Sequence, residues 1–120
     1  MDYSMNDLMK DIAVWHKETF DTTFEAQLIK LAEEVKEAHD AKTKEEWHKE
    51  MADVVFVLAA LINRYDDMTS KAIYSTMWTV MDENDRKAIK SELIAKFEKN
   101  KKRIWVRMPD GTYHHAQGTD

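Results

Sequence analysis

The segment from residue 43 to about residue 64 constrains the fold most, because it opens with a capping box, Thr43 and Glu46, and continues with apolar residues at helical spacing. On a helical wheel Glu50 falls inside the apolar stripe, and Asp53 lies at its margin. An ionised carboxylate without a partner is costly in such a place. These two acids are therefore expected to be protonated, ion-paired or bound to a cation. The apolar residues of the stripe are Trp47, Met51, Val54, Val57, Leu58 and Leu61.

A second acidic group lies on the preceding segment, which we predict to be a helix that opens at an N-cap Thr22 and ends near residue 40. Glu33, Glu34 and Glu37 fall within about a third of the circumference of this helix and border its apolar face. Taken alone, the segment is equally explained by a solvated acidic face with lysines beside it. The expected apolar face consists of Phe24, Leu28, Leu31, Val35 and Ala38.

The rest of the chain predicts three further helices. One begins after an N-cap Ser4 and ends near residues 19–21, and a turn is expected over 65–70. A short helix then covers about 72–80, and the acidic run 82–85 separates it from the last helix. The apolar residues of that last helix are Ile89, Leu93, Phe97 and Ile104.

The composition indicates one all-α domain, because the 120 residues include only two glycines, one proline and no cysteine. We predict this domain over 1–108, as a bundle of four to five helices, followed by a polar, mobile tail over 109–120. The longest apolar run, 54–62, is much shorter than the roughly 20 residues of a membrane span. With no secretion signal and no disulfide framework, we expect a cytoplasmic protein, in the host cytoplasm if phage-encoded. The net charge of −5 argues against a nucleic-acid partner.

The acidic residues predict a metal site, since acid pairs on two facing helices supply oxygen ligands suited to Mg²⁺ or Mn²⁺. A di-iron pattern of Glu-x-x-His is not formed, because His39 and His48 have other offsets from the acids. A solvated or ion-paired cluster remains the alternative, and the position of Glu50 favours the metal.

A polar row on the last helix has the chemistry to complement such a site. Lys96, Asn100 and Arg103 recur at i, i+4 and i+7 beside the apolar stripe. Cations are also common near a helix C-terminus for electrostatic reasons alone, so this row has an ordinary explanation as well. A nucleic-acid binder that uses the basic run 96–107 is a weaker hypothesis.

The acidic motifs resemble those of the MazG-like all-α nucleoside triphosphate pyrophosphohydrolases, whose mark is E-E-x-x-E followed by E-x-x-D. Here the motifs read Glu33-Glu34-x-x-Glu37 and Glu50-x-x-Asp53, and the later Lys96-x-x-x-Asn100-x-x-Arg103-x-Trp105 also matches. The flanking Trp15-x-x-x-Thr19-Phe20 and the late Asp110-Gly111 with His114 look most like the dATP/dGTP diphosphohydrolase branch of phages and bacteria.

This resemblance implies a dimer or dimer of dimers that hydrolyses a nucleoside triphosphate to the monophosphate and pyrophosphate. It implies that Glu34, Glu37, Glu50 and Asp53 bind two or more Mg²⁺ ions, with Mn²⁺ as a substitute, and that Glu33 is a further ligand or orients the attacking water. The expected substrate-binding residues are Lys96, Asn100, Arg103, Trp15 and Lys30.

The substrate and the activity have open alternatives. Deoxypurine triphosphates are expected from the branch alone, and pyrimidine substrates such as dCTP or dUTP, or non-standard nucleotides, remain alternatives. A catalytically silent oligomer that binds a nucleotide or a basic partner segment is a further class of hypothesis. Stacking on a base is considered for Trp15, Phe20 and Trp47, although aromatic residues at helical spacing more often belong to the core.

Overall fold

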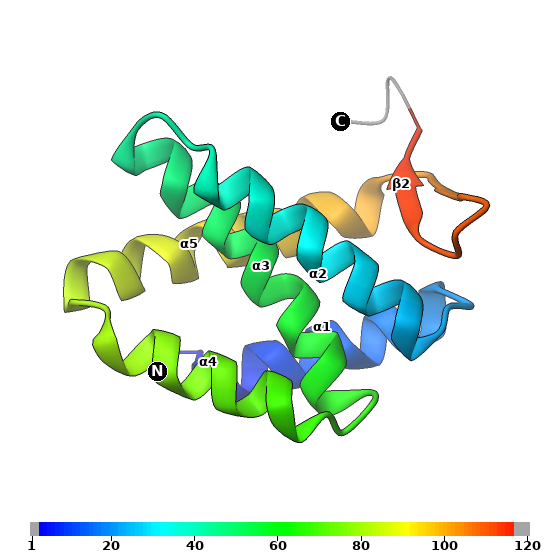
Figure 1. Cartoon of the computed structure of the whole chain (residues 1–120), viewed down its shortest axis with the longest axis horizontal. Helices are drawn as coiled ribbons and strands as arrows, with labels where there is room; N and C mark the ends of the chain where they lie inside the picture. The colour runs from blue at the N-terminus through cyan, green and yellow to red at the C-terminus, as the bar shows by residue number, and fades with distance from the viewer. Residues whose placement is uncertain (1–2, 117–120) are drawn as a thin grey trace.

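The computed structural model describes residues 3–116, and within this range five α-helices are followed by a small antiparallel hairpin (Figure 1). The all-α prediction is confirmed, and the hairpin is an addition to it. No helix in the described range is long and apolar enough to cross a membrane. The elements are α1 Met5–Thr19, α2 Phe24–His39, α3 Lys44–Asn63, α4 Met68–Val80, α5 Glu83–Lys102, β1 Trp105–Arg107 and β2 Tyr113–His115.

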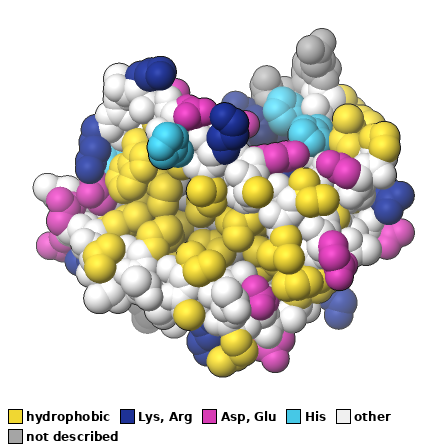
Figure 2. All heavy atoms as spheres, in the orientation of Figure 1, with side chains coloured by type: hydrophobic (Ala, Val, Ile, Leu, Met, Phe, Trp, Pro, Cys, Tyr) yellow, Lys and Arg dark blue, Asp and Glu magenta, His cyan; other side chains and the backbone are white. Residues whose placement is uncertain are grey.

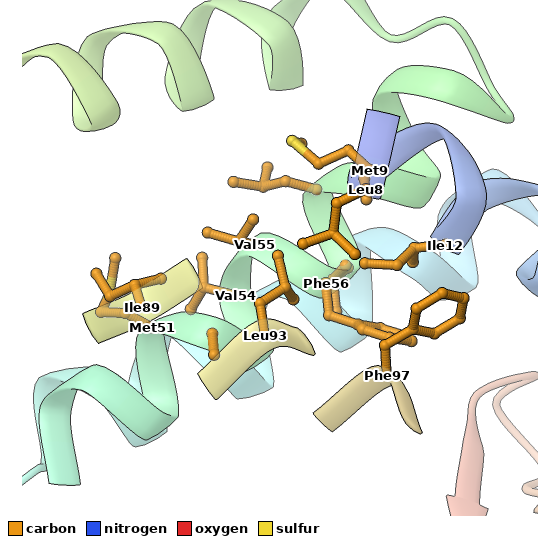
Figure 3. Close-up of a cluster of buried hydrophobic side chains, with 14 of the residues drawn as sticks. Leu8, Met9, Ile12, Met51, Val54, Val55, Phe56, Ile89, Leu93 and Phe97 are labelled. Atoms are coloured by element: carbon orange, nitrogen blue, oxygen red, sulfur yellow. The ribbon is translucent and has the colours of Figure 1, made fainter. Parts of the chain in front are cut away.

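Helix α3 is the centre of the bundle and packs against the other four helices. Its residues from Met51 to Leu61 are buried except for Asp53, which is half-buried. Figure 3 shows Val55 and Phe56 of α3 among core side chains of α1 and α5. The strongest apolar pattern in the sequence therefore corresponds to the most buried helix.

The helix starts follow the expected capping chemistry, with two corrections. Ser4 and Thr43 are N-caps as predicted, but Thr23 rather than Thr22 caps α2, since its hydroxyl accepts the N–H of Ala26 at 3.1 Å. The expected turn over 65–70 is shorter, because Asp67 caps α4 and starts it at residue 68. Sequence patterns place a cap only to within a residue or two when neighbouring residues can both accept the bond.

The acidic break before the last helix is confirmed, and its first residue has a direct structural role. Asp82 caps α5, and its Oδ1 accepts the N–H of Asp85 at 2.8 Å. Asp82→Ala removes this acceptor, so we expect it to lower the free energy of unfolding by about 1 kcal/mol. Thermal unfolding should show a fall of roughly 3–5 °C. Asp82→Asn, which keeps the acceptor, is the matched control, and equal losses in both variants would contradict the capping role.

The buried face of α2 differs from the predicted one. Leu28 and Val35 are 40% and 49% exposed, whereas the polar Gln27 and Glu34 are 5% and 8% exposed. Periodicity alone assigns the apolar residues to the core, but here Gln27 lies beside His16 of α1, and Glu34 lies beside Asp53 of α3. Three residues of the expected apolar face, Leu31, Val35 and Ala38, line a surface groove.

That groove lies between α2, α3 and α4, where hydrophobic side chains gather on the face drawn in Figure 2. The expected homo-oligomer would give such a surface a natural partner, and it remains a prediction. The residues that line the groove are Leu31, Val35, Ala38, His39, Trp47, Met51, Val54, Ile73 and Met77.

The C-terminal hairpin occupies part of the segment expected to be a tail. It pairs Val106 with His114, and its turn needs Gly111, whose φ of 85° lies in the left-handed region. The hydroxyl of Thr22 donates to the carbonyl of Gly111 at 2.9 Å, which fixes the turn against the start of α2. Ile104, expected on the last helix, lies beyond the end of α5 and is 64% exposed. The predicted tail residues 117–120 lie outside the described range.

Candidate metal centre

Four carboxylates from two helices converge at one place. Glu34 and Glu37 of α2 meet Glu50 and Asp53 of α3, and one oxygen atom of each lies within 4.8 Å of the others. The i, i+3 spacing puts each pair on one face of its helix, and the packing of α2 against α3 brings the two faces together. The structure thus assembles the four acids expected to be metal ligands.

The four acids carry more negative charge than their surroundings offset. Burial, followed by the nearby Asp53 carboxylate, raises the pKa of Glu34 to about 7. Burial and repulsion from Asp53 and Glu37 likewise raise the pKa of Glu50. The Oε2 atoms of Glu34 and Glu50 are buried without a hydrogen-bond partner among the described residues. Unpaired carboxylate oxygens in such a cluster are suited to coordinate a hard cation.

Two lysines from different helices approach the cluster. Lys96 Nζ of α5 lies 3.2 Å from Asp53 Oδ1, and Lys30 Nζ of α2 lies 3.5 Å from Glu34 Oε1. Burial nevertheless outweighs Lys96 and raises the pKa of Asp53. Both ammonium groups also face the cavity beside the acids, where they can contact an anionic ligand.

The polar row of α5 continues away from the acids. Asn100 is 5% exposed, and its Oδ1 accepts a hydrogen bond of 2.8 Å from Arg103. Its backbone carbonyl accepts the indole N–H of Trp105 at 3.1 Å. Lys96, Asn100 and Arg103 all line the same cavity, as the sequence spacing predicted for a shared face.

Glu33 is placed apart from the other four acids. Its side chain is 38% exposed and pairs with Lys30 at 3.6 Å, and it does not belong to the group of converging oxygens. It does line the cavity next to that group. Its position is therefore that of a neighbour of the four converging carboxylates.

The cavity has a volume of about 290 Å³ and extends from the acids to the hairpin. Its polar and aromatic side chains come from α1, α2, α3, α5 and the hairpin, so most of the fold contributes to it. The lining residues are His16, Phe20, Gln27, Lys30, Glu33, Glu34, Glu37, Asp53, Phe56, Val57, Lys96, Asn100, Arg103, Trp105, Tyr113, His114 and His115.

The three aromatic residues considered for stacking on a base lie in three different places. Trp15 does not line the cavity; its ring packs behind it, 5.2 Å from Phe20 and 5.9 Å from Phe97 between centroids. Trp47 lines the apolar groove instead. Phe20 lines the cavity, together with Trp105 and Tyr113 of the hairpin.

Sequence reasoning missed His16 and Gln27 at the hairpin end of the cavity, although it named Phe20, Trp105 and His114. His16 and Gln27 have no motif of their own, and their burial becomes evident only from the tertiary structure. The strands were detectable in principle, since Asp110-Gly111 lies between Trp105-Val106 and Tyr113, and Asp-Gly favours a hairpin turn.

Comparison with known proteins gives a similarity in structure and none in sequence. No protein-family model and no curated protein matches the sequence. A solved structure described as a cyanophage S-2L MazG-like pyrophosphohydrolase bound to dGDP and three catalytic Mn²⁺ ions per active site is similar, with 23% identity and a TM-score of 0.46. The likeness covers 99% of this chain and 98% of that chain.

Proposed function

We propose that this protein is a nucleoside triphosphate pyrophosphohydrolase that converts a dNTP to the dNMP and pyrophosphate with Mg²⁺, and with Mn²⁺ as a substitute. The convergence of four carboxylates, three of which line one cavity together with Lys96, carries the proposal. Acids that gather cations and bases that contact anions are needed together for a metal-bridged triphosphate.

The donor set fits a hard divalent cation. All four converging groups are carboxylates, and two of them have a buried oxygen without a partner among the described residues. We assign Glu34, Glu37, Glu50 and Asp53 as the ligands of two or more ions. When bound, these ions would activate water and offset the negative charge of the triphosphate.

The remaining polar side chains bind and orient the substrate. Lys96 and Lys30 stand beside the acids and would hold phosphate oxygens, while Asn100 and Arg103 extend the contacts towards the sugar. Glu33, next to the ligands but outside the converging group, would orient the attacking water or serve as a further ligand.

The proposals for the substrate, the cellular location and the oligomeric state rest on the motif resemblance. We propose dGTP or dATP as the preferred substrate, a cytoplasmic location and assembly into a dimer or tetramer. The apolar groove between α2, α3 and α4 supports the assembly, because it leaves hydrophobic side chains at the surface.

The direct test is incubation of the protein with each dNTP and Mg²⁺ while pyrophosphate release is measured. We expect release from at least one dNTP, and its loss when EDTA removes the metal. Release of orthophosphate in place of pyrophosphate would show that a different bond is cleaved. If no dNTP is turned over while one binds, the protein is a catalytically silent nucleotide-binding module.

A further inference from the structure

A chain of hydrogen bonds crosses the hairpin end of the cavity. An Nη atom of Arg64 lies 2.9 Å from His16 Nδ1, and the Gln27 side chain is the other hydrogen-bonding neighbour of that imidazole. Gln27 Nε2 donates to Thr22 Oγ1 at 3.3 Å, and Thr22 donates in turn to the Gly111 carbonyl. These hydrogen bonds therefore link α3, α1, α2 and the hairpin turn.

The charge of Arg64 determines which atom donates and which accepts in each of these hydrogen bonds. A guanidinium only donates, so His16 Nδ1 accepts and its proton lies on Nε2. Burial, then the charge of Arg64, lowers the pKa of His16 to about 4, so the ring is neutral at pH 7. The Nε2–H group is then the donor that faces Gln27, and the amide oxygen of Gln27 is the acceptor that suits it, because the Gln27 nitrogen donates to Thr22.

In this orientation, the Gln27 amide keeps hydrogen-bonding groups with which it can bind a ligand. Of its two N–H groups and two oxygen lone pairs, the network uses one of each. One donor and one acceptor remain on a side chain that is 5% exposed and lines the cavity. An amide held in this way matches a neighbouring acceptor and donor on the edge of a nucleobase.

Helix α2 also sets the distance from this amide to the acids. Gln27, Lys30 and Glu34 lie at i, i+3 and i+7, so they share one face of the helix. Seven residues of helix span about 10 Å. This length suits a nucleotide whose phosphates lie at Glu34 and whose base lies at Gln27.

Three aromatic rings line the same cavity as the amide. Phe20 and Tyr113 lie 4.7 Å apart between ring centroids, and Phe20 and Trp105 lie 5.2 Å apart. All three rings line the cavity with Gln27. Flat apolar faces beside a fixed hydrogen-bonding group are what stacking and reading of a base require.

We propose that the end of the cavity bounded by α1, α2 and the hairpin is the nucleobase subsite, in which Gln27 reads the base edge and Tyr113 packs on the base. The inference rests on the proposed function for the identity of the ligand as a nucleotide. His16 and Thr22 act as positioning residues, because they contact Gln27 and fix its amide.

The test compares the wild-type protein with Gln27→Met, which keeps the length of the side chain and removes its hydrogen bonds. The kcat/KM is measured for the four dNTPs and for deoxyribose 5′-triphosphate, which has no base. We expect the ratio between the best and the worst dNTP to shrink by about 10- to 100-fold. The value for the base-free substrate should change by less than about 2-fold, because the metal end of the cavity is untouched. An unchanged ratio, or an equal loss on the base-free substrate, would overturn the proposal.

Tyr113→Leu is a second variant, at a residue whose side chain makes no hydrogen bond to His16, Gln27 or Thr22 among the described residues. It should lower kcat/KM for all four dNTPs by about 5- to 100-fold, with little change of their ratios. The base-free substrate should again be unaffected, and an equal loss on it would exclude the hairpin end as the base subsite. If Gln27→Met does not fold, this variant decides where the base lies.

A separate measurement distinguishes failure of the proposed function from failure of the base subsite. It gives the dissociation constants of α,β-methylene dNTPs in the presence of Mg²⁺. If the wild-type protein turns over no dNTP but binds these analogues with base preference, loss of that preference in Gln27→Met supports the subsite. Binding without base preference, or no binding, overturns the subsite as well.

Discussion

Glu50→Gln is expected to reduce Mg²⁺-dependent pyrophosphate release to background. The substitution removes a charged ligand from the converging carboxylates while keeping nearly the same shape. A loss of about 4 kcal/mol of transition-state stabilisation corresponds to about 1,000-fold in rate. Pyrophosphate release measures the rate, and calorimetric titration with Mg²⁺ or Mn²⁺ measures the affinity for the metal. We expect the rate and the metal affinity both to fall.

The fold should tolerate this change, because Glu50 lies in a group of acids that repel one another. Without metal, the midpoint of thermal unfolding of Glu50→Gln should be equal to or above that of the wild-type protein. Glu45→Gln is the matched control, since Glu45 lies on the same helix with a side chain that is 85% exposed. Full activity of Glu50→Gln would remove Glu50 from the metal centre.

The second large effect concerns the pH dependence of stability in metal-free protein. The pKa of Glu34 is raised from an ordinary 4.5 to about 7, so between these values the folded state holds a proton that the unfolded state has lost. Stability from this group is therefore complete below pH 4.5 and is lost as the pH rises through 7, with a total of roughly 3 kcal/mol. Urea unfolding in EDTA at pH 5, 6, 7 and 8 measures it.

Glu34→Gln isolates this contribution, because it cannot titrate. The variant is needed since His16, with its pKa lowered to about 4, gives stability that rises with pH over nearly the same range. The stability gained by Glu34→Gln over the wild-type protein should grow from pH 5 to pH 8. Saturating Mg²⁺ should stabilise the wild-type protein at pH 8 by about 3 kcal/mol at 100 times Kd. Curves for the two proteins that run parallel at all pH values would rule out a raised pKa of Glu34.

The helices were predictable because their signals are local. The N-cap at Thr43 and the break at Asp82 depend on residues within one turn, and both are found in the structure, although the Glu46 carboxylate accepts the N–H of Lys42 and not that of Thr43. The same is true of the i, i+3 acid pairs, whose shared faces follow from helical geometry. The meeting of the two pairs also required α2 to pack against α3, which the short link between them favoured.

The roles of His16 and Gln27 at the hairpin end of the cavity were not predictable, because these residues meet through tertiary contacts. Gln27 resembles any polar residue on an amphipathic helix until α1 and the hairpin are placed around it. The exposure of Leu28 and Val35 has the same origin. Helical periodicity identifies an apolar face, and it does not reveal that a second, polar face is buried around a cavity.

The common helix face of Gln27, Lys30 and Glu34 limits how this region can change in evolution. Insertion or deletion of one residue between Gln27 and Glu34 would rotate one end of the cavity by about 100° relative to the other. This stretch of α2 can therefore accept substitutions but not changes of length. The link at 64–67 is restricted as well, because Arg64 contacts His16 and Asp67 caps α4, so variation in the length of related chains should concentrate in the link at 40–43.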